Sequence, residues 1–417
     1  MTTAMSTLLF FSLAAGCNGK DAEEAEAPTY TRDVAPIVDS RCAGCHEVGG
    51  IAPFSLTTYD EVSLYADLVA RSVADRLMPP AQPADGCATY TPDPSLTQDE
   101  IDTITRWADA GAPEGDSADA TEVAPRQDPA EIDRVDLAIQ LPEPYVVTEP
   151  GNEYRCFVVD WPEERDVYVT GVGVEPGNPA IVHHVIAYLF PSESVATIEA
   201  LDAADEGPGY ACYGGPLIER TGDRPAWLGG WAPGGTGRNM PEGSGILVEA
   251  GSKLVIQVHY HADDNAVPAT DQSSLLVKVD DAVETPGEMV PFTDFDWVLA
   301  ENMPIPAGSD DLVYTTSTAW AEDARIYDVG LHMHTLGRAG SLKIQHSDGS
   351  ETCLLDMDTW DFDWQLAYRL DAPALLAAGD SLSLSCVFDN PTDVEVNWGE
   401  NTEDEMCLGV LYMTAAD

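Results

Sequence analysis

The sequence predicts a multidomain chain in which a small all-α domain precedes two all-β domains of the β-sandwich, jelly-roll-like kind. Its 417 residues are enough for two or three hydrophobic cores of ordinary size. Apolar residues follow a helical pattern in residues 28–113. Beyond about residue 137 they alternate in short runs between turn residues, and the 34 glycines and 30 prolines fit a largely β structure.

The N-terminus predicts an exported protein. Residues 8–13 form an apolar run too short to span a bilayer, so residues 1–17 are expected to be a signal peptide. The letters AAGC at residues 14–17 resemble a bacterial lipoprotein cleavage site. They predict a lipid on Cys17, a periplasmic or outer-membrane location, and membrane contact only through that anchor. An ordinary cleaved signal peptide is the alternative.

Charge excludes one class of partner. The chain has 73 acidic residues against 19 lysines and arginines, and a formal net charge of −54. Such a surface repels phosphate backbones, so nucleic acid is excluded as a partner. Two acidic, unpatterned stretches predict flexible segments: residues 18–27 a tether and residues 114–136 an interdomain linker.

Residues 28–113 are expected to form the helical domain. Thr97 and Glu100 have the spacing of a capping box, which predicts that a helix carrying Trp107 begins there and ends at Gly111. Earlier in this domain, Cys42, Cys45 and His46 form a C-x-x-C-H motif, which is typical of covalent attachment of c-type haem.

The spacing of this motif fits haem chemistry. Thiols one helical turn apart reach the two vinyl groups, while the adjacent His46 binds iron. Met78, in the letters RLMPP, lies where a small cytochrome c has its second axial ligand. A zinc site or a redox dithiol is the alternative, but zinc needs two more ligands and only Cys87 is near. The sequence therefore predicts a cytochrome c-like domain with covalent haem c.

The rest of the chain is expected to divide into β-sandwiches at residues 137–283 and 284–417. Residues 252–262, 325–335, 341–346 and 380–388 alternate as half-buried strands do. Six histidines in this region form three close pairs, and an H-x-H pair on a strand places both imidazoles on one face. The pairs are His183–His184, His259–His261 and His332–His334.

Imidazoles with a thioether favour copper over zinc. Such a thioether is present in Met406. Adjacent strand residues point to opposite faces, so His183 and His184 can share a metal only if the backbone bends or if they use different ring nitrogens. Core or surface histidines are the alternative to a metal site.

From about residue 154 onward the chain resembles the copper type II ascorbate-dependent monooxygenases, the family of peptidylglycine and dopamine β-monooxygenase. The resemblance rests on five phrases in family order: VHHVIAYLF, LVIQVHYHA, VGLHMHTLGRAG, GDSLSLSCVFDN and WGENTEDEMCLGVLYM.

The resemblance implies which residues bind metal. An electron-transferring copper would be held by His183, His184 and His259. A second, oxygen-binding copper would be held by the catalytic residues His332, His334 and Met406. A disulfide between Cys386 and Cys407 is also implied, while His261 has no ligand counterpart in the family.

Where peptidylglycine monooxygenase binds a peptide carboxylate, this chain has Gly330, Leu408 and Val410. The resemblance therefore implies a less polar substrate. The sequence leaves open how Cys87, Cys156, Cys212 and Cys353 pair, because any pairing is compatible with an oxidising compartment.

The expected function is hydroxylation of a C–H bond of a small organic substrate with O2, using two copper ions. Electrons would come from ascorbate or a periplasmic redox protein, with the fused haem as a possible carrier. A non-catalytic electron-transfer or copper-binding lipoprotein with the same ligands is the alternative.

Overall fold

The computed structural model describes residues 27–48, 52–91, 93, 95–121, 132–212, 215–216, 225–231, 237–262, 265–300, 302–362, 364–399 and 403–416. The predicted signal peptide, the lipid on Cys17, nearly all of the tether and the middle of the linker lie outside these residues. No helix among the described residues is long and apolar enough to cross a membrane.

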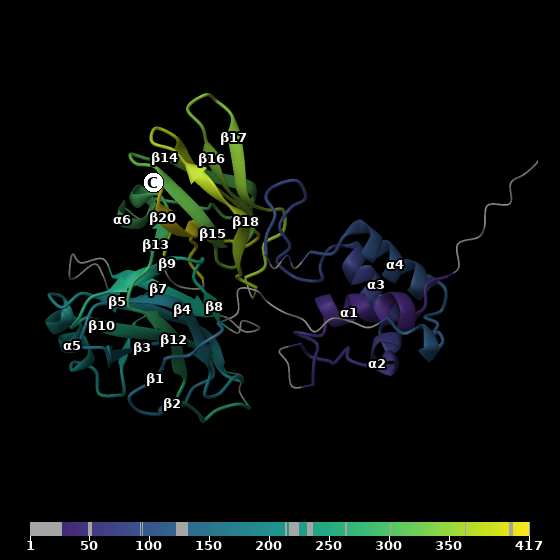
Figure 1. Cartoon of the computed structure of the whole chain (residues 1–417), viewed down its shortest axis with the longest axis horizontal. Helices are drawn as coiled ribbons and strands as arrows, with labels where there is room; N and C mark the ends of the chain where they lie inside the picture. Colours follow the sequence, from purple (N-terminus) through teal and green to yellow (C-terminus); the bar gives the residue numbers. More distant parts are fainter. Residues whose placement is uncertain are drawn as a thin grey trace, which may run out of the picture.

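The N-terminal region is helical and has its own core. After a π-helical turn at Tyr30–Val34 come α1 (Ala35–Arg41), α2 (Tyr59–Leu64), α3 (Ala66–Ala74) and α4 (Gln98–Asp109). They enclose a separate apolar cluster centred on the fully buried Trp107. Figure 1 shows these helices grouped to one side of the β structure.

The predicted start and end of the last helix are confirmed. The Thr97 hydroxyl accepts from the backbone N–H of Glu100, whose carboxylate accepts in return from the N–H of Thr97, so both halves of the capping box are present. The helix ends before Gly111, which has the left-handed φ of +84° that favours glycine.

The remaining described chain is mostly β, as predicted, and its first half runs to Asp280. These elements are β1 (Leu137–Gln140), β2 (Tyr145–Val147), β3 (Gly151–Asp160), β4 (Val167–Glu175), β5 (Val182–Phe190), α5 (Val195–Asp202), β6 (Tyr210–Ala211), β7 (Ala226–Trp231), β8 (Arg238–Asn239), β9 (Ser244–Val248), β10 (Lys253–Ala262), β11 (Ala269–Asp271) and β12 (Ser274–Asp280).

The second half contains β13 (Thr285–Phe292), α6 (Phe295–Ala300), β14 (Ser309–Ala319), β15 (Ala324–His332), β16 (Gly337–Gln345), β17 (Glu351–Met357), β18 (Ala367–Leu376), β19 (Ser381–Asn390) and β20 (Leu408–Ala415). All four strands predicted from alternation are present as β10, β15, β16 and β19, with ends shifted by a few residues.

The two larger apolar cores of the described β structure lie on either side of one shared strand. One core is built almost entirely from residues of β1–β12 and the other from residues of β13–β20. Strand β13 pairs with β20 on one side and with β7 and β9 on the other. A continuous sheet therefore joins the two halves and fixes their relative position. The predicted boundary at 283/284 falls immediately before this strand.

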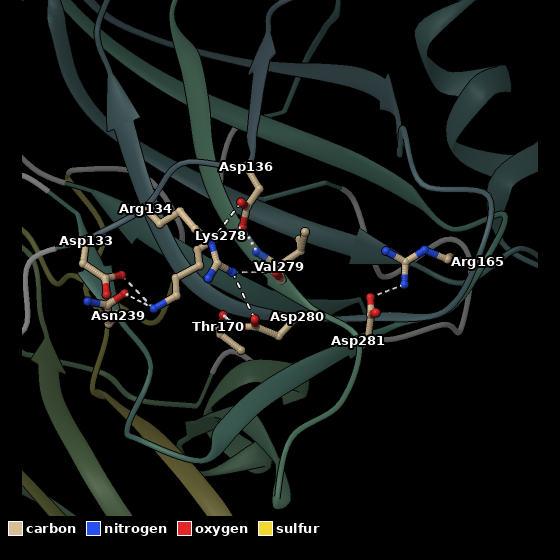
Figure 2. Close-up of polar contacts among 10 residues, drawn as sticks. All are labelled: Asp133, Arg134, Asp136, Arg165, Thr170, Asn239, Lys278, Val279, Asp280 and Asp281. Atoms are coloured by element: carbon tan, nitrogen blue, oxygen red, sulfur yellow. Dashed lines mark hydrogen bonds and ion pairs between the residues drawn. The ribbon is translucent and has the colours of Figure 1, made fainter.

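The predicted linker is folded at both of its described ends. At its start, the backbone N–H of Thr31 donates to the carbonyl of Glu114 over 2.9 Å. At its end, Arg134 donates to the carbonyl of Val279 and to Asp280, and Lys278 donates to Asp133, as Figure 2 shows. The described ends of the predicted linker are therefore hydrogen-bonded to the folded regions on either side.

A second attachment joins the helical region to the β structure, and the sequence did not predict it. The chain between α3 and α4 reaches the edge of β18, where Tyr90 forms an antiparallel bridge with Leu370. The N–H of Thr91 donates to the carbonyl of Arg369, and the Tyr90 hydroxyl donates to the carbonyl of Leu354, both over 2.9 Å. A disulfide between Cys87 and Cys353 makes this attachment covalent.

The two remaining disulfides lie within the β halves. The structure pairs Cys156 with Cys212, which resolves the pairing that the sequence left open. It also pairs Cys386 with Cys407, which confirms the disulfide implied by the resemblance. Three disulfides fit an exported protein, since such bonds persist in oxidising compartments.

Candidate metal centres

Three predicted ligands of the first site come together on β5 and β10. Each of His183, His184 and His259 offers a ligand atom, and all three atoms lie within 4.8 Å of one another. The Nδ1 atom of His184 is 3.5 Å from Nδ1 of His183 and 3.2 Å from Nδ1 of His259. The Nδ1 atoms of the three rings therefore converge.

A β-bulge explains how adjacent histidines face the same point. His259 pairs with His184, but the next residue of β10, Tyr260, pairs with Val182, so His183 is an extra residue in β5. A bulge bends the strand and re-aims a side chain. Of the two ways in which both histidines could share a metal, the structure shows the bent backbone.

Asn152 on β3 fixes the orientation of His259. The Nε2–H of His259 donates to Oδ1 of Asn152 over 2.8 Å, so its Nδ1 carries the lone pair that faces the cluster. His261 also bonds Asn152, through its own Nδ1 at 3.0 Å. His261 is not one of the three clustered histidines, as the resemblance implied.

Burial keeps His184 and His259 neutral. Desolvation, followed by the neighbouring histidines, lowers the pKa of His184 to about 3 and places the pKa of His259 far below its usual range. Neutral imidazole is the form that binds metal, so the histidines do not have to lose protons at neutral pH.

The second site contains His332, at the end of β15, and His334 just beyond it. Their ring centroids are 5.1 Å apart. The Nδ1–H of His332 donates to Oε1 of Gln365, and the Nδ1–H of His334 donates to the carbonyl of Asp404 over 3.1 Å. Both tautomers therefore carry their lone pair on Nε2, the opposite of the first site. Burial lowers the pKa of His332 to about 3.

Glu405 ties the segment that carries Met406 to this histidine pair. Its carboxylate is fully buried and accepts from the backbone N–H of His334 over 2.9 Å, of Leu336, and of Met406 over 3.2 Å. The Cys386–Cys407 disulfide holds the same segment from its other end. Burial outweighs these hydrogen bonds and raises the pKa of Glu405 to about 7.

The two sites lie close to each other. Burial is the main cause of the depressed pKa of His184, and the nearby His183, His332 and His334 depress it further. One aromatic ring is near both sites: the centroid of Phe362 is 6.4 Å from that of His183 and 6.0 Å from that of His334.

Sequence reasoning missed Asn152, Gln365, Glu405 and Phe362. None lies in a histidine pair, and only Glu405 adjoins a predicted ligand. The eighth histidine, His346, has a structural role. Its Nδ1 bonds Asp380 and its Nε2 bonds Thr352, which closes the hairpin of β16 and β17.

In the helical region, Cys42 lies directly after α1, and Cys45 and His46 follow in the next turn. Nδ1 of His46 donates to the carbonyl of Phe54 over 2.9 Å, which fixes the tautomer with its lone pair on Nε2. Met78 is 39% exposed.

Residues 298–415 match the family model of the copper type II ascorbate-dependent monooxygenase, C-terminal domain. This segment contains His332, His334 and Met406. The chain is also 24% identical over 289 residues to DBH-like monooxygenase protein 2 of Mus musculus. That alignment covers 63% of this chain but only 43% of the mouse protein, so the chain matches less than half of its relative.

Solved structures similar to the chain are distant. An N-glycanase F structure aligns with 67% of this chain and 96% of its own length, at 10% identity and a TM-score of 0.32. The VP2 subviral particle of infectious bursal disease virus aligns with 68% of this chain and 73% of its own, at 11% identity and a TM-score of 0.19.

Proposed function

We propose that this chain is an exported copper monooxygenase that hydroxylates a C–H bond of a small organic substrate, with a c-type haem domain as a source of electrons. The overall reaction would be RH + O2 + 2 e⁻ + 2 H⁺ → ROH + H2O. The observation that carries the proposal is the pair of neighbouring histidine sites, the second of them within the segment that matches the monooxygenase family model.

The first cluster fits a metal ion. Two imidazole nitrogens bound to one ion at about 2.0–2.1 Å lie roughly 3.3–3.6 Å apart at tetrahedral to trigonal angles. The Nδ1 separations of 3.5 and 3.2 Å in the cluster are close to this. His183, His184 and His259 would hold an electron-transferring copper.

The second site fits a softer ligand set. His332 and His334 present Nε2, and Glu405 and the disulfide at Cys407 hold the segment that carries Met406. A thioether beside imidazoles favours the cuprous state. Copper bound there would activate O2. The chain orients the two rings through Gln365 and the Asp404 carbonyl, and burial, which lowers the pKa of His332 to about 3, keeps that ring unprotonated.

The helical region fits a covalent haem. His46 is oriented to present Nε2, and Cys42 and Cys45 are half-buried beside it. Apolar side chains of this region are unusually exposed: Leu64 is 74%, Leu77 58% and Met78 39% exposed. An apolar macrocycle would cover surface of this kind. Cys42 and Cys45 would attach the haem, with His46 and Met78 as axial ligands.

Metal content and oxygen use test the proposal. Protein produced with a haem-attachment system should contain two coppers and one covalent haem that survives acid-acetone extraction, whereas Cys45→Ala should weaken that attachment. With a panel of small apolar compounds and ¹⁸O2, labelled hydroxyl product should appear, and Met406→Ile should abolish it while the first copper is retained.

Two outcomes would contradict the proposal. Zinc in both sites, or a single copper, would refute the two-copper assignment. Reversible copper and haem reduction without any labelled product across the panel would instead support a non-catalytic electron-transfer or copper-binding protein.

A further inference from the structure

The strongest unexplained feature is the side chain of Phe362, which lies in the connection between β17 and β18. It is half-buried but belongs to none of the apolar cores of the described β structure. Its ring approaches His183, with an interplanar angle of 21°, and His334, with an angle of 85°. One ring therefore spans from the first histidine site to the second.

The connection that carries Phe362 is built around the second site. The Trp360 indole N–H donates to the carbonyl of His334 over 3.2 Å, and the Trp360 backbone N–H donates to the carbonyl of Arg338 over 2.7 Å. On the other side of Phe362, the Gln365 amide accepts from His332 through Oε1 and donates through Nε2 to the carbonyl of Phe362 over 2.9 Å. The group that orients His332 thus also fixes Phe362.

The surface beside His332 is also apolar. Across the β15–β20 pair, Gly330 is opposite Val410 and His332 is opposite Leu408. Directly paired residues share one face of a sheet, so Leu408 and Val410 lie on the face of His332. Both are half-buried, and neither is part of an apolar core of the described chain.

We propose that Phe362 is a specificity-determining residue, whose ring occupies the space between the two histidine sites and limits the second site to compact ligands. This inference rests on the proposed function for the presence of copper, but not on turnover. A molecule that reaches the second site has to fit against the Phe362 ring and the apolar face of β20. A bulky aryl group collides with the ring, while a compact ligand does not.

Ligand binding to the copper-loaded, full-length protein tests this. The probes are azide, which is compact, and 4-phenylimidazole, which is bulky. Binding is followed by the cupric electron paramagnetic resonance signal, which is distinct from that of haem iron. In Phe362→Ala, affinity for 4-phenylimidazole should rise at least tenfold, while affinity for azide should stay within about twofold. Phe362→Trp should weaken binding of 4-phenylimidazole.

Phe295→Ala is the matched control, because it removes a phenyl ring that is 51% exposed on α6. It should change neither affinity. Copper content of all three variants shows whether the sites are intact. The proposal would be overturned if Phe362→Ala changed the affinity for both probes equally. It would also be overturned if neither wild type nor Phe362→Ala bound 4-phenylimidazole. If selectivity shifts as expected while no hydroxylated product forms, the proposed function fails and Phe362 still controls access.

Discussion

Replacing Glu405 with Gln tests how burial affects the carboxyl group that accepts hydrogen bonds from the backbone of the second site. Burial raises the pKa of this carboxyl from 4.5 to about 7. The folded protein therefore binds its proton more tightly than the unfolded chain does, so the neutral form stabilises the fold below about pH 4.5. That stability is lost as the pH rises through 7. At 1.36 kcal/mol per pKa unit, the loss is about 3 kcal/mol, most of it between pH 5 and 8.

The assay is urea unfolding of the metal-free protein at pH 5, 6.5 and 8, in parallel for wild type and Glu405→Gln. Gln has the same shape and does not titrate, so between pH 5 and pH 8 the wild type should lose about 2.5 kcal/mol relative to the variant. The depressed pKa values of His184 and His332 act in the opposite direction, but they are present in both proteins and cancel in the difference. If the wild type instead kept or gained stability relative to Glu405→Gln as the pH rises, the N–H donors from His334, Leu336 and Met406 would dominate over burial.

Two further predictions concern the supports of each site. Asn152→Ala removes the acceptor that orients His259, so copper affinity at the first site should fall at least about tenfold, measured in competition with a chelator. An unchanged affinity would mean that stacking of the His259 ring on Tyr154 orients it instead. The double variant Cys386→Ser/Cys407→Ser removes a disulfide that joins residues 21 positions apart in the sequence. The unfolded chain then gains the entropy of the opened loop, so the free energy of unfolding measured in urea should fall by about 3 kcal/mol. A loss below about 1 kcal/mol would contradict this entropic explanation.

The histidine clusters could be predicted because their pattern is local. Histidine pairs are visible in the sequence, and alternation located the strands that carry two of them. Alternation also predicted that His183 and His184 point apart unless the strand bends. A bulge depends on the partner strand β10, which a single sequence does not place, so only the structure could identify the bend.

The residues that support the ligands could not be predicted, because each acts across a long separation in sequence. Asn152 is 107 residues from His259, and Glu405 is 71 residues from His334. An acidic chain offers 73 carboxylates, and nothing in the sequence marks Glu405 as the buried one. The pairing of Cys87 with Cys353, separated by 266 residues, was hidden for the same reason.

That disulfide changes what the linker can do. A linker alone would let the helical region diffuse within the reach of a flexible chain. The Cys87–Cys353 bond, the Tyr90–Leu370 bridge and the buried Tyr90 hydroxyl instead fix one of its segments against β17 and β18. Strand β18 begins two residues after Gln365, so this attachment lies on the side of the second site.

A protease site inserted within residues 122–131 tests whether the attachment holds without the linker. After cleavage, the wild-type fragments should migrate together in non-reducing denaturing electrophoresis and separate on reduction, because the disulfide still joins them. Cys87→Ser should separate without reductant. Under native conditions, the amide protons of Thr91 and Asp371 should stay protected from exchange in cleaved wild type, since both donate across the junction. Rapid exchange there, with the disulfide intact, would mean that the helical region moves freely on a covalent tether and has no fixed position relative to the second site.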